Sequence, residues 1–163
     1  MKIRHICVLL ALLMALVCVS GSAEALYEAV RVDFEDGFSL TVPADWVSFE
    51  ANGEALEHGI LYVLGSADGA RQMYVQQWDT QYETLSQLEE ALRERDDLQL
   101  LNPESIGSNA FLMYGFTDRD CTGCLTVHSG TVLNLMFAPQ SDAEFMAIAA
   151  TIMDSCRWIE VDE

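Results

Sequence analysis

The chain has 163 residues, and its 26 acidic residues outnumber its eight lysines and arginines, giving a formal net charge of −18 at pH 7. Such an acidic surface repels nucleic-acid phosphates and anionic lipid headgroups, which argues against both as partners. Apolar residues make up 51% of the chain, too many for a disordered protein and enough for one domain with a real core.

The first segment in chain order has the pattern of an export signal over residues 1–25. A short basic start precedes an apolar run at residues 6–19, and residues 23–25 fit the A-x-A cleavage pattern. The run is shorter than the ~20 residues that a membrane-spanning helix needs. We therefore expect cleavage before Leu26, export to the periplasm or the cell exterior, and no stable membrane span afterwards; an uncleaved anchor is the alternative.

Cleavage changes the composition of the remaining single domain, residues 26–163. It removes Lys2 and Arg4 from the basic residues and Glu24 from the acidic ones, leaving six arginines, no lysine and 25 carboxylates. The net charge becomes −19, and the cysteines fall from five to three. Acidity keeps an exported protein in solution. It would also tolerate a cationic or neutral partner, such as a protein or another component of the cell envelope.

The domain alternates strand patterns with two amphipathic helices and contains no linker or repeat. The strand patterns cover residues 29–34, 38–42, 46–49, 59–64, 71–78, 109–116, 124–128 and 131–137. A capping box with Thr84 as N-cap predicts a helix that ends near Arg95, and a second capping box beginning at Ser141 predicts a final helix. These elements predict an α+β domain, with an antiparallel sheet packed by helices.

A family resemblance begins at the second strand pattern. Residues 37–46, GFSLTVPADW, resemble the strand-Pro-x-x-Trp start of PsbP-like domains, a group that includes the DcrB-type exported bacterial proteins. The order of elements is similar over about residues 30–160. The resemblance implies an α/β/α sandwich and an accessory or binding role. It carries over no functional residues, because Pro43 would end a strand and Trp46 would fill the core.

The sharpest local motif is C-T-G-C at residues 121–124. Gly123 suits the third position of a type II turn, where φ is positive, and such a turn brings the two end residues to disulfide distance. Because export favours oxidation, we predict a disulfide between Cys121 and Cys124.

Other roles for these cysteines stay open at this point. Cys156 could pair with either member of the motif, or pack as a small apolar side chain in the last helix. A redox-active motif is a further reading, and so is a zinc site that adds His128. A thiol, disulfide or metal-binding protein built on Cys121, Cys124 and Cys156 is therefore the alternative function.

One strand pattern suggests a ligand surface. Gln72, Tyr74, Gln76 and Trp78 share one face, and aromatic rings with amides can stack on a sugar or a peptide. The competing interpretation is that a helix covers the two aromatic side chains.

Enzyme chemistry finds little support in the sequence. After cleavage the only histidines are His58 and His128, and no nucleophile elbow, zinc-protease motif or phosphate loop occurs. We expect no cofactor, no metal and no catalytic residue. The sequence therefore favours an exported, non-enzymatic binding or accessory domain.

Overall fold

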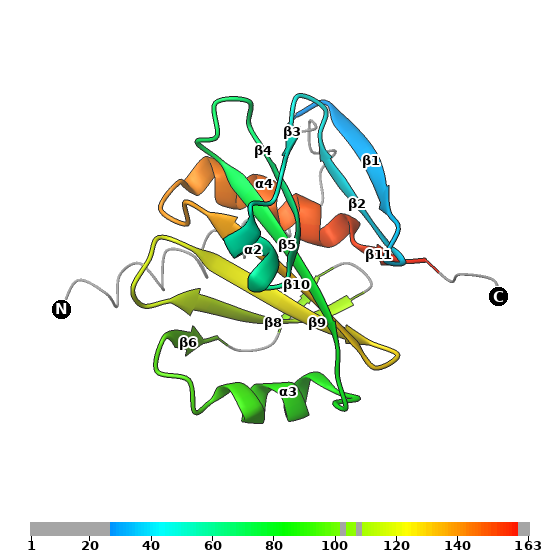
Figure 1. Ribbon diagram of the computed structural model, residues 1–163, viewed down its shortest axis with the longest axis vertical. Coiled ribbons are helices and arrows are strands. Elements are labelled where there is room, and N and C mark those ends of the chain that lie inside the picture. The colour runs from blue at the N-terminus through cyan, green and yellow to red at the C-terminus, as the bar shows by residue number, and fades with distance from the viewer. Residues whose placement is uncertain (1–26, 102–103, 107–108, 160–163) are drawn as a thin grey trace.

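The computed structural model describes residues 27–101, 104–106 and 109–159, so the predicted export signal at residues 1–25 lies outside the described residues. Two antiparallel sheets and three helices make up this described part (Figure 1). None of the described helices is long and apolar enough to cross a membrane.

The large sheet has the strand order β3-β4-β5-β10-β9-β8-β6, and β7 pairs with β8 off this path. Its strands are β3 (Val47–Phe49), β4 (Ile60–Gly65), β5 (Gln72–Asp79), β6 (Leu98–Leu100), β7 (Glu104–Ile106), β8 (Asn109–Phe116), β9 (Thr122–His128) and β10 (Thr131–Ala138). The turn between β9 and β10 consists of Ser129 and Gly130, with φ values of 48° and 78°. Positive φ at both positions matches the right-handed twist of the two strands that this tight hairpin joins.

The small sheet has the order β1-β2-β11. Its strands are β1 (Ala29–Phe34), β2 (Phe38–Pro43) and β11 (Arg157–Trp158). As expected, Pro43 ends a strand, and Trp46 packs against the main core with its ring 6.1 Å from that of Phe145.

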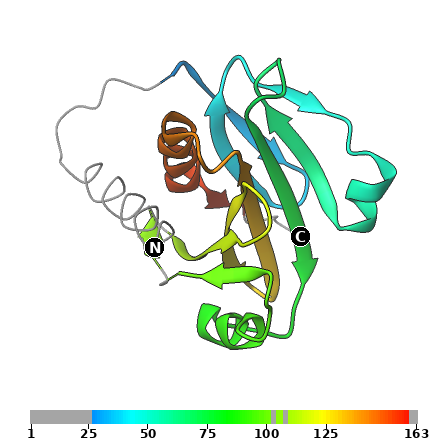
Figure 2. The ribbon, with the colours of Figure 1, turned by 90° about the vertical axis from the view of Figure 1, so that its left-hand side faces the viewer.

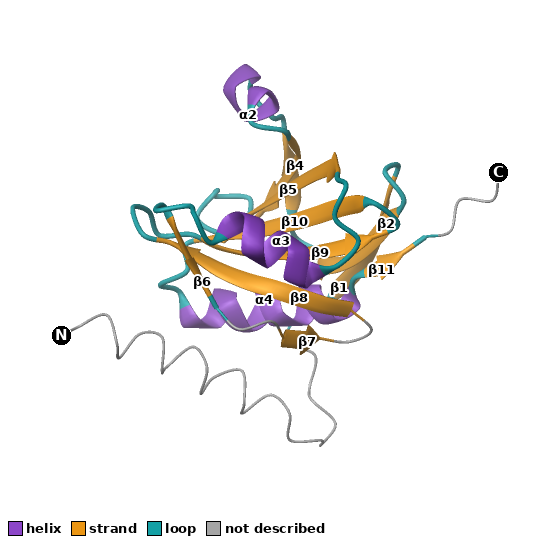
Figure 3. Ribbon diagram, turned by 90° about the horizontal axis from the view of Figure 1, so that it is seen from below, coloured by secondary structure: helices purple, strands orange, loops and turns teal. Residues whose placement is uncertain are grey.

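The helices lie on both sides of the large sheet. They are α2 (Gly53–Glu57), α3 (Leu85–Leu92) and α4 (Ala143–Ser155). Figure 2 shows α4 on one side of the large sheet and α3 on the other side. Figure 3 shows α2 away from these two helices. The α+β class and the arrangement of helices on both faces of an antiparallel sheet are thus confirmed.

The large sheet separates two apolar cores. The main core lies between the sheet, α4 and the small sheet, whereas the second core lies under α3. The main core includes the fully buried Phe38, Phe111, Phe137, Phe145 and Ile152. The second core includes Leu88, Leu112, Tyr114, Leu125 and Val132.

Capping interactions fix where the two long helices begin. The predicted capping box of α3 is present, with the Thr84 hydroxyl accepting from the Gln87 backbone N–H. At α4 the cap is one residue later than predicted: the Asp142 carboxylate accepts from the Phe145 N–H at 3.0 Å. Ser141 instead donates its hydroxyl to Asp120, which closes the loop before the helix.

Candidate binding face

The four residues predicted as a ligand surface lie on one side of β5. Tyr74 packs into the second core, and the strand alternation places Gln72, Gln76 and Trp78 on the same side. Their binding role stays a prediction. The helix on this side, α3, packs on β6, β8 and β9, and β5 lies beyond it (Figure 2). Trp78 is accordingly 40% exposed.

The other members of this set form hydrogen bonds within the domain. Tyr74 is half-buried and donates its hydroxyl to the Gln72 side-chain oxygen at 2.6 Å. Burial raises the pKa of the Tyr74 hydroxyl, so it is a donor at neutral pH. The two aromatic side chains therefore differ: Tyr74 is half-buried, while Trp78 presents its ring to solvent.

A chain of side-chain hydrogen bonds crosses the sheet beneath this surface. Tyr114 on β8 donates to the Asn134 carbonyl at 2.8 Å, Asn134 on β10 donates to the Gln76 carbonyl at 2.6 Å, and Gln76 donates to the backbone oxygen of His58 at 2.7 Å. We call these four residues the cross-sheet network. Both polar atoms of the Gln76 amide are thus occupied within the domain, so Trp78 is the accessible member of the set.

The glycine of the C-T-G-C motif serves this network. Gly123 does not adopt the predicted turn with positive φ; it lies within β9, opposite Tyr114 on β8. A Cβ at Gly123 would overlap the Tyr114 ring, 2.7 Å from its Cε1 atom. The ring therefore crosses β9 at the one residue without a side chain, and its hydroxyl reaches Asn134 on β10.

The predicted Cys121–Cys124 disulfide is wrong for this structure, in which both residues and Cys156 are free, buried thiols. The physical reason is the strand: residues three apart on extended backbone point to opposite faces. Cys121 consequently lies in the second core, while Cys124 and Cys156 lie in the main core.

The same burial leaves the alternative thiol or metal function without support. Burial raises the pKa of Cys121 and of Cys156 to about 11, and that of Cys124 further, so all three are protonated at neutral pH. His128, the fourth ligand considered for zinc, stacks on the Trp158 ring at 5.0 Å. In the part of the chain that the structure describes, no three potential ligands are grouped to hold a metal ion.

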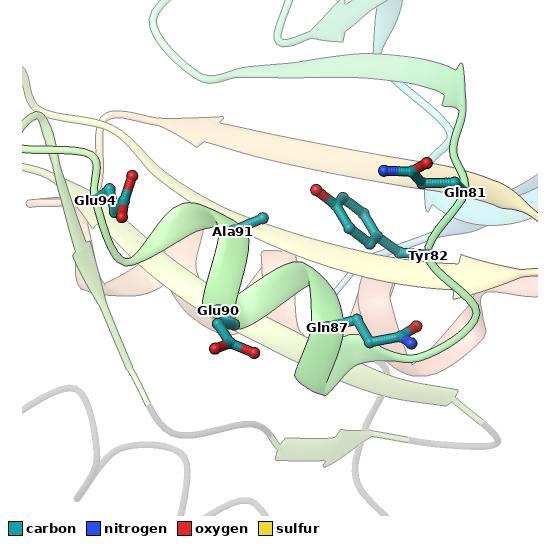
Figure 4. Close-up of a pocket in the computed structure, with 6 residues that line it drawn as sticks. All are labelled: Gln81, Tyr82, Gln87, Glu90, Ala91 and Glu94. Atoms are coloured by element: carbon teal, nitrogen blue, oxygen red, sulfur yellow. The ribbon is translucent and has the colours of Figure 1, made fainter.

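A shallow pocket of about 530 Å³ lies beside α3. Its lining residues are Gln81, Tyr82, Gln87, Glu90, Ala91 and Glu94. Figure 4 shows the Tyr82 ring directed along the sheet toward Ala91, with Glu94 and Gln81 at opposite ends. The pocket begins only a few residues after Trp78 along the chain. We refer to Trp78, the half-buried Tyr74 and this pocket together as the open face.

Sequence reasoning identified the β5 half of the open face and missed the pocket. Tyr82 and Gln81 lie in the connection between β5 and α3, and the remaining lining residues lie on or just after the helix. Their only signal was the position of Ala91: a small residue on the exposed side of an amphipathic helix leaves room beside it.

Comparisons with known proteins indicate the fold. No protein-family model matches the sequence, and no curated protein is significantly similar to it. Cyanobacterial PsbP (CyanoP) from Synechocystis sp. PCC 6803 is similar in structure, with a TM-score of 0.55 and 15% identity over 87% of this chain and 99% of that chain. A protein of Bacteroides thetaiotaomicron VPI-5482 is similar with a TM-score of 0.56 and 13% identity over 85% of this chain. This chain spans 50% of that protein's length. The chain therefore has a PsbP-like fold.

Proposed function

We propose that this chain is an exported, non-enzymatic binding or accessory domain whose ligand docks on the open face. The signal pattern at residues 1–25 and the resemblance of residues 37–46 to DcrB-type proteins support export. The PsbP-like fold supports an accessory role by analogy, since fold alone does not define function.

The observation that carries the proposal is the exposed ring of Trp78. A tryptophan that is 40% exposed, paired across the sheet with the buried Val132 and three residues before Gln81 of the pocket, offers a large rigid contact area at small conformational cost. The cross-sheet network holds the strand beneath it, because the Gln76 amide is fixed on both sides by β10 and by the His58 carbonyl. The surface is therefore formed before any ligand arrives.

The test compares two exposed apolar side chains on different parts of the molecule. Trp78→Ala should weaken co-sedimentation of the purified domain with cell-envelope material by about tenfold or more, as expected for a central aromatic contact. Val30→Ala is the matched control, because Val30 is 45% exposed on β1 of the small sheet. Circular dichroism should show both variants folded.

The opposite result for the two variants would place the binding site elsewhere on the domain. If Val30→Ala abolished co-sedimentation while Trp78→Ala left it unchanged, the ligand would dock on the small sheet, and the open face would have no binding role.

A further inference from the structure

All the arginines of this domain form ion pairs or hydrogen bonds with other groups of the same chain. Five form ion pairs with neighbouring carboxylates, and the sixth donates to backbone oxygens. These residues are Arg31, Arg71, Arg93, Arg95, Arg119 and, in the last case, Arg157. Since residues 26–163 contain no lysine, a partner has to supply any further cation.

The pocket beside α3 carries two carboxylates that these arginines do not neutralise. Glu90 and Glu94 are exposed, and among the described residues neither takes part in an ion pair. Arg93 lies between them in sequence, but its guanidinium is bound to Glu89 at 2.6 Å. The negative charge at the pocket is therefore available to a ligand.

An aromatic ring lines the same pocket. Tyr82 is half-buried against the second core and faces the pocket (Figure 4). A ring face next to carboxylates attracts cations through its quadrupole, an effect that grows as water is excluded. The side-chain amide of Gln81 adds a carbonyl oxygen that can accept a hydrogen bond, whereas the Gln87 carbonyl already accepts the backbone N–H groups of Glu83 and Thr84 in the capping box.

We propose that the open face binds a basic segment of a partner protein, with one arginine side chain seated in the pocket against Tyr82, Glu90 and Glu94. This proposal rests on the proposed function and names its partner chemistry. A guanidinium is favoured over an ammonium because its planar fork stacks on a ring and donates two hydrogen bonds to one carboxylate. Trp78 would contact the same segment farther along β5.

Charge also favours a basic partner over a second copy of this chain as the molecule that binds the open face. A copy would bring the same net charge of −19 and no uncommitted arginine from the described residues, so self-association on this face is electrostatically unfavourable.

The experiment uses a Gly/Ser peptide of twelve residues that carries four arginines, and the same peptide with lysines. Calorimetry should show the arginine peptide binding more tightly than the lysine peptide, and NMR shifts should concentrate on Tyr82, Ala91 and Glu94. The double variant Glu90→Gln/Glu94→Gln should weaken binding of the arginine peptide at least fivefold.

A charge-matched control separates the pocket from general attraction to an acidic protein. Glu28→Gln/Asp154→Asn removes the same charge at exposed positions, one before β1 and the other on α4, and should change the affinity less than twofold. An equal loss in this control would overturn the proposal, because binding would then be unspecific.

Substitution of the ring tests the stacking interaction. Tyr82→Phe keeps the aromatic face and should retain binding, whereas Tyr82→Leu should weaken it about fivefold. Equal affinities for the phenylalanine and leucine variants would contradict a stacked guanidinium.

The partner chemistry and the proposed function can fail separately. If neither peptide bound but Trp78→Ala still abolished envelope binding, the open face would remain the site and the arginine proposal would be wrong. If Trp78→Ala had no effect on envelope binding either, both would be wrong.

Discussion

At the scale of single residues, the absence of a side chain at Gly123 allows a hydrogen bond that links β8 to β10 across β9. The Tyr114 ring occupies the volume that a side chain at Gly123 would need, and it delivers a hydroxyl to a buried asparagine on the next strand but one. Asn134 is 4% exposed, so its amide depends on partners within the protein.

Gly123→Ala should therefore be strongly destabilising. The new methyl group would displace a ring that is itself buried, and the displaced hydroxyl would leave Asn134 without its donor. Overpacking and an unsatisfied polar group together predict a loss of about 3 kcal/mol in the free energy of unfolding. Urea denaturation measures it. Gly53→Ala in α2 is the control, because nothing lies within 4 Å of its Cβ position. An equally small loss in both variants would show that the ring can move aside.

At the scale of elements, the start of α4 is fastened to the turn between β4 and β5. Asp142 accepts a hydrogen bond from Arg71 at 2.8 Å in addition to capping the helix, and Glu144 binds the same guanidinium at 2.9 Å. The backbone N–H of Phe145, and next Arg71, lower the pKa of Asp142 below its usual 3.8. The ionised cap thus stabilises the folded state above that pH.

Asp142→Ala should cost about 1–2 kcal/mol at pH 7, the usual loss for an N-cap. A carboxyl group whose folded pKa is depressed contributes stability above its unfolded pKa and loses it as the pH falls through the folded value. The difference between wild type and variant should therefore shrink below about pH 4. Thermal denaturation at pH 7 and pH 3 measures this. Asp142→Asn keeps a capping oxygen and should lose less; an unchanged difference at pH 3 would contradict the charge effect.

The sequence pattern predicted elements well where periodicity was strong. The strand patterns identified β5 and β10, and the capping box identified α3. Short elements such as α2, β6 and β11 have too few residues to show a period, and tertiary contacts hold them. The error at residues 121–124 has a different cause: glycine serves both turns and close approach of a neighbouring ring, and only Tyr114, nine residues away in sequence, distinguishes the two.

The candidate site was predictable in part for the same reason. Period-two alternation placed Trp78 and Tyr74 on one face, because strand geometry decides this locally. That Gln76 is bound on both sides depends on Asn134 and on the His58 backbone, which come from other elements. The pocket beside α3 depends on where the helix rests on the sheet, and the small side chain of Ala91 is its only local signal in the sequence.

At the scale of the whole molecule, a single sheet distributes three thiols between two separate cores. Cys121 is on the α3 side, and Cys124 and Cys156 are on the α4 side. Burial raises the pKa of each thiol, so the folded state both shields and protonates them. Their role is to fill apolar space rather than to cross-link the chain.

Thiol counting checks this arrangement directly. Protein beginning at Leu26 should show no fast-reacting thiol toward a disulfide reagent under native conditions. It should show three after denaturation without a reductant. A count of one after denaturation would demonstrate a disulfide, and a fast native reaction would contradict the burial.

The cross-sheet network also limits how this sequence can diverge. Tyr114, Asn134 and Gln76 each complete the hydrogen bonding of the next, and Tyr114 requires a glycine at position 123. A single replacement leaves a buried polar group without a partner or a ring without space. A relative with a larger residue at position 123 must therefore also have exchanged Tyr114 for a smaller side chain. Positions 76, 114, 123 and 134 are therefore expected to be inherited as a set, even in lineages where identity elsewhere has fallen away.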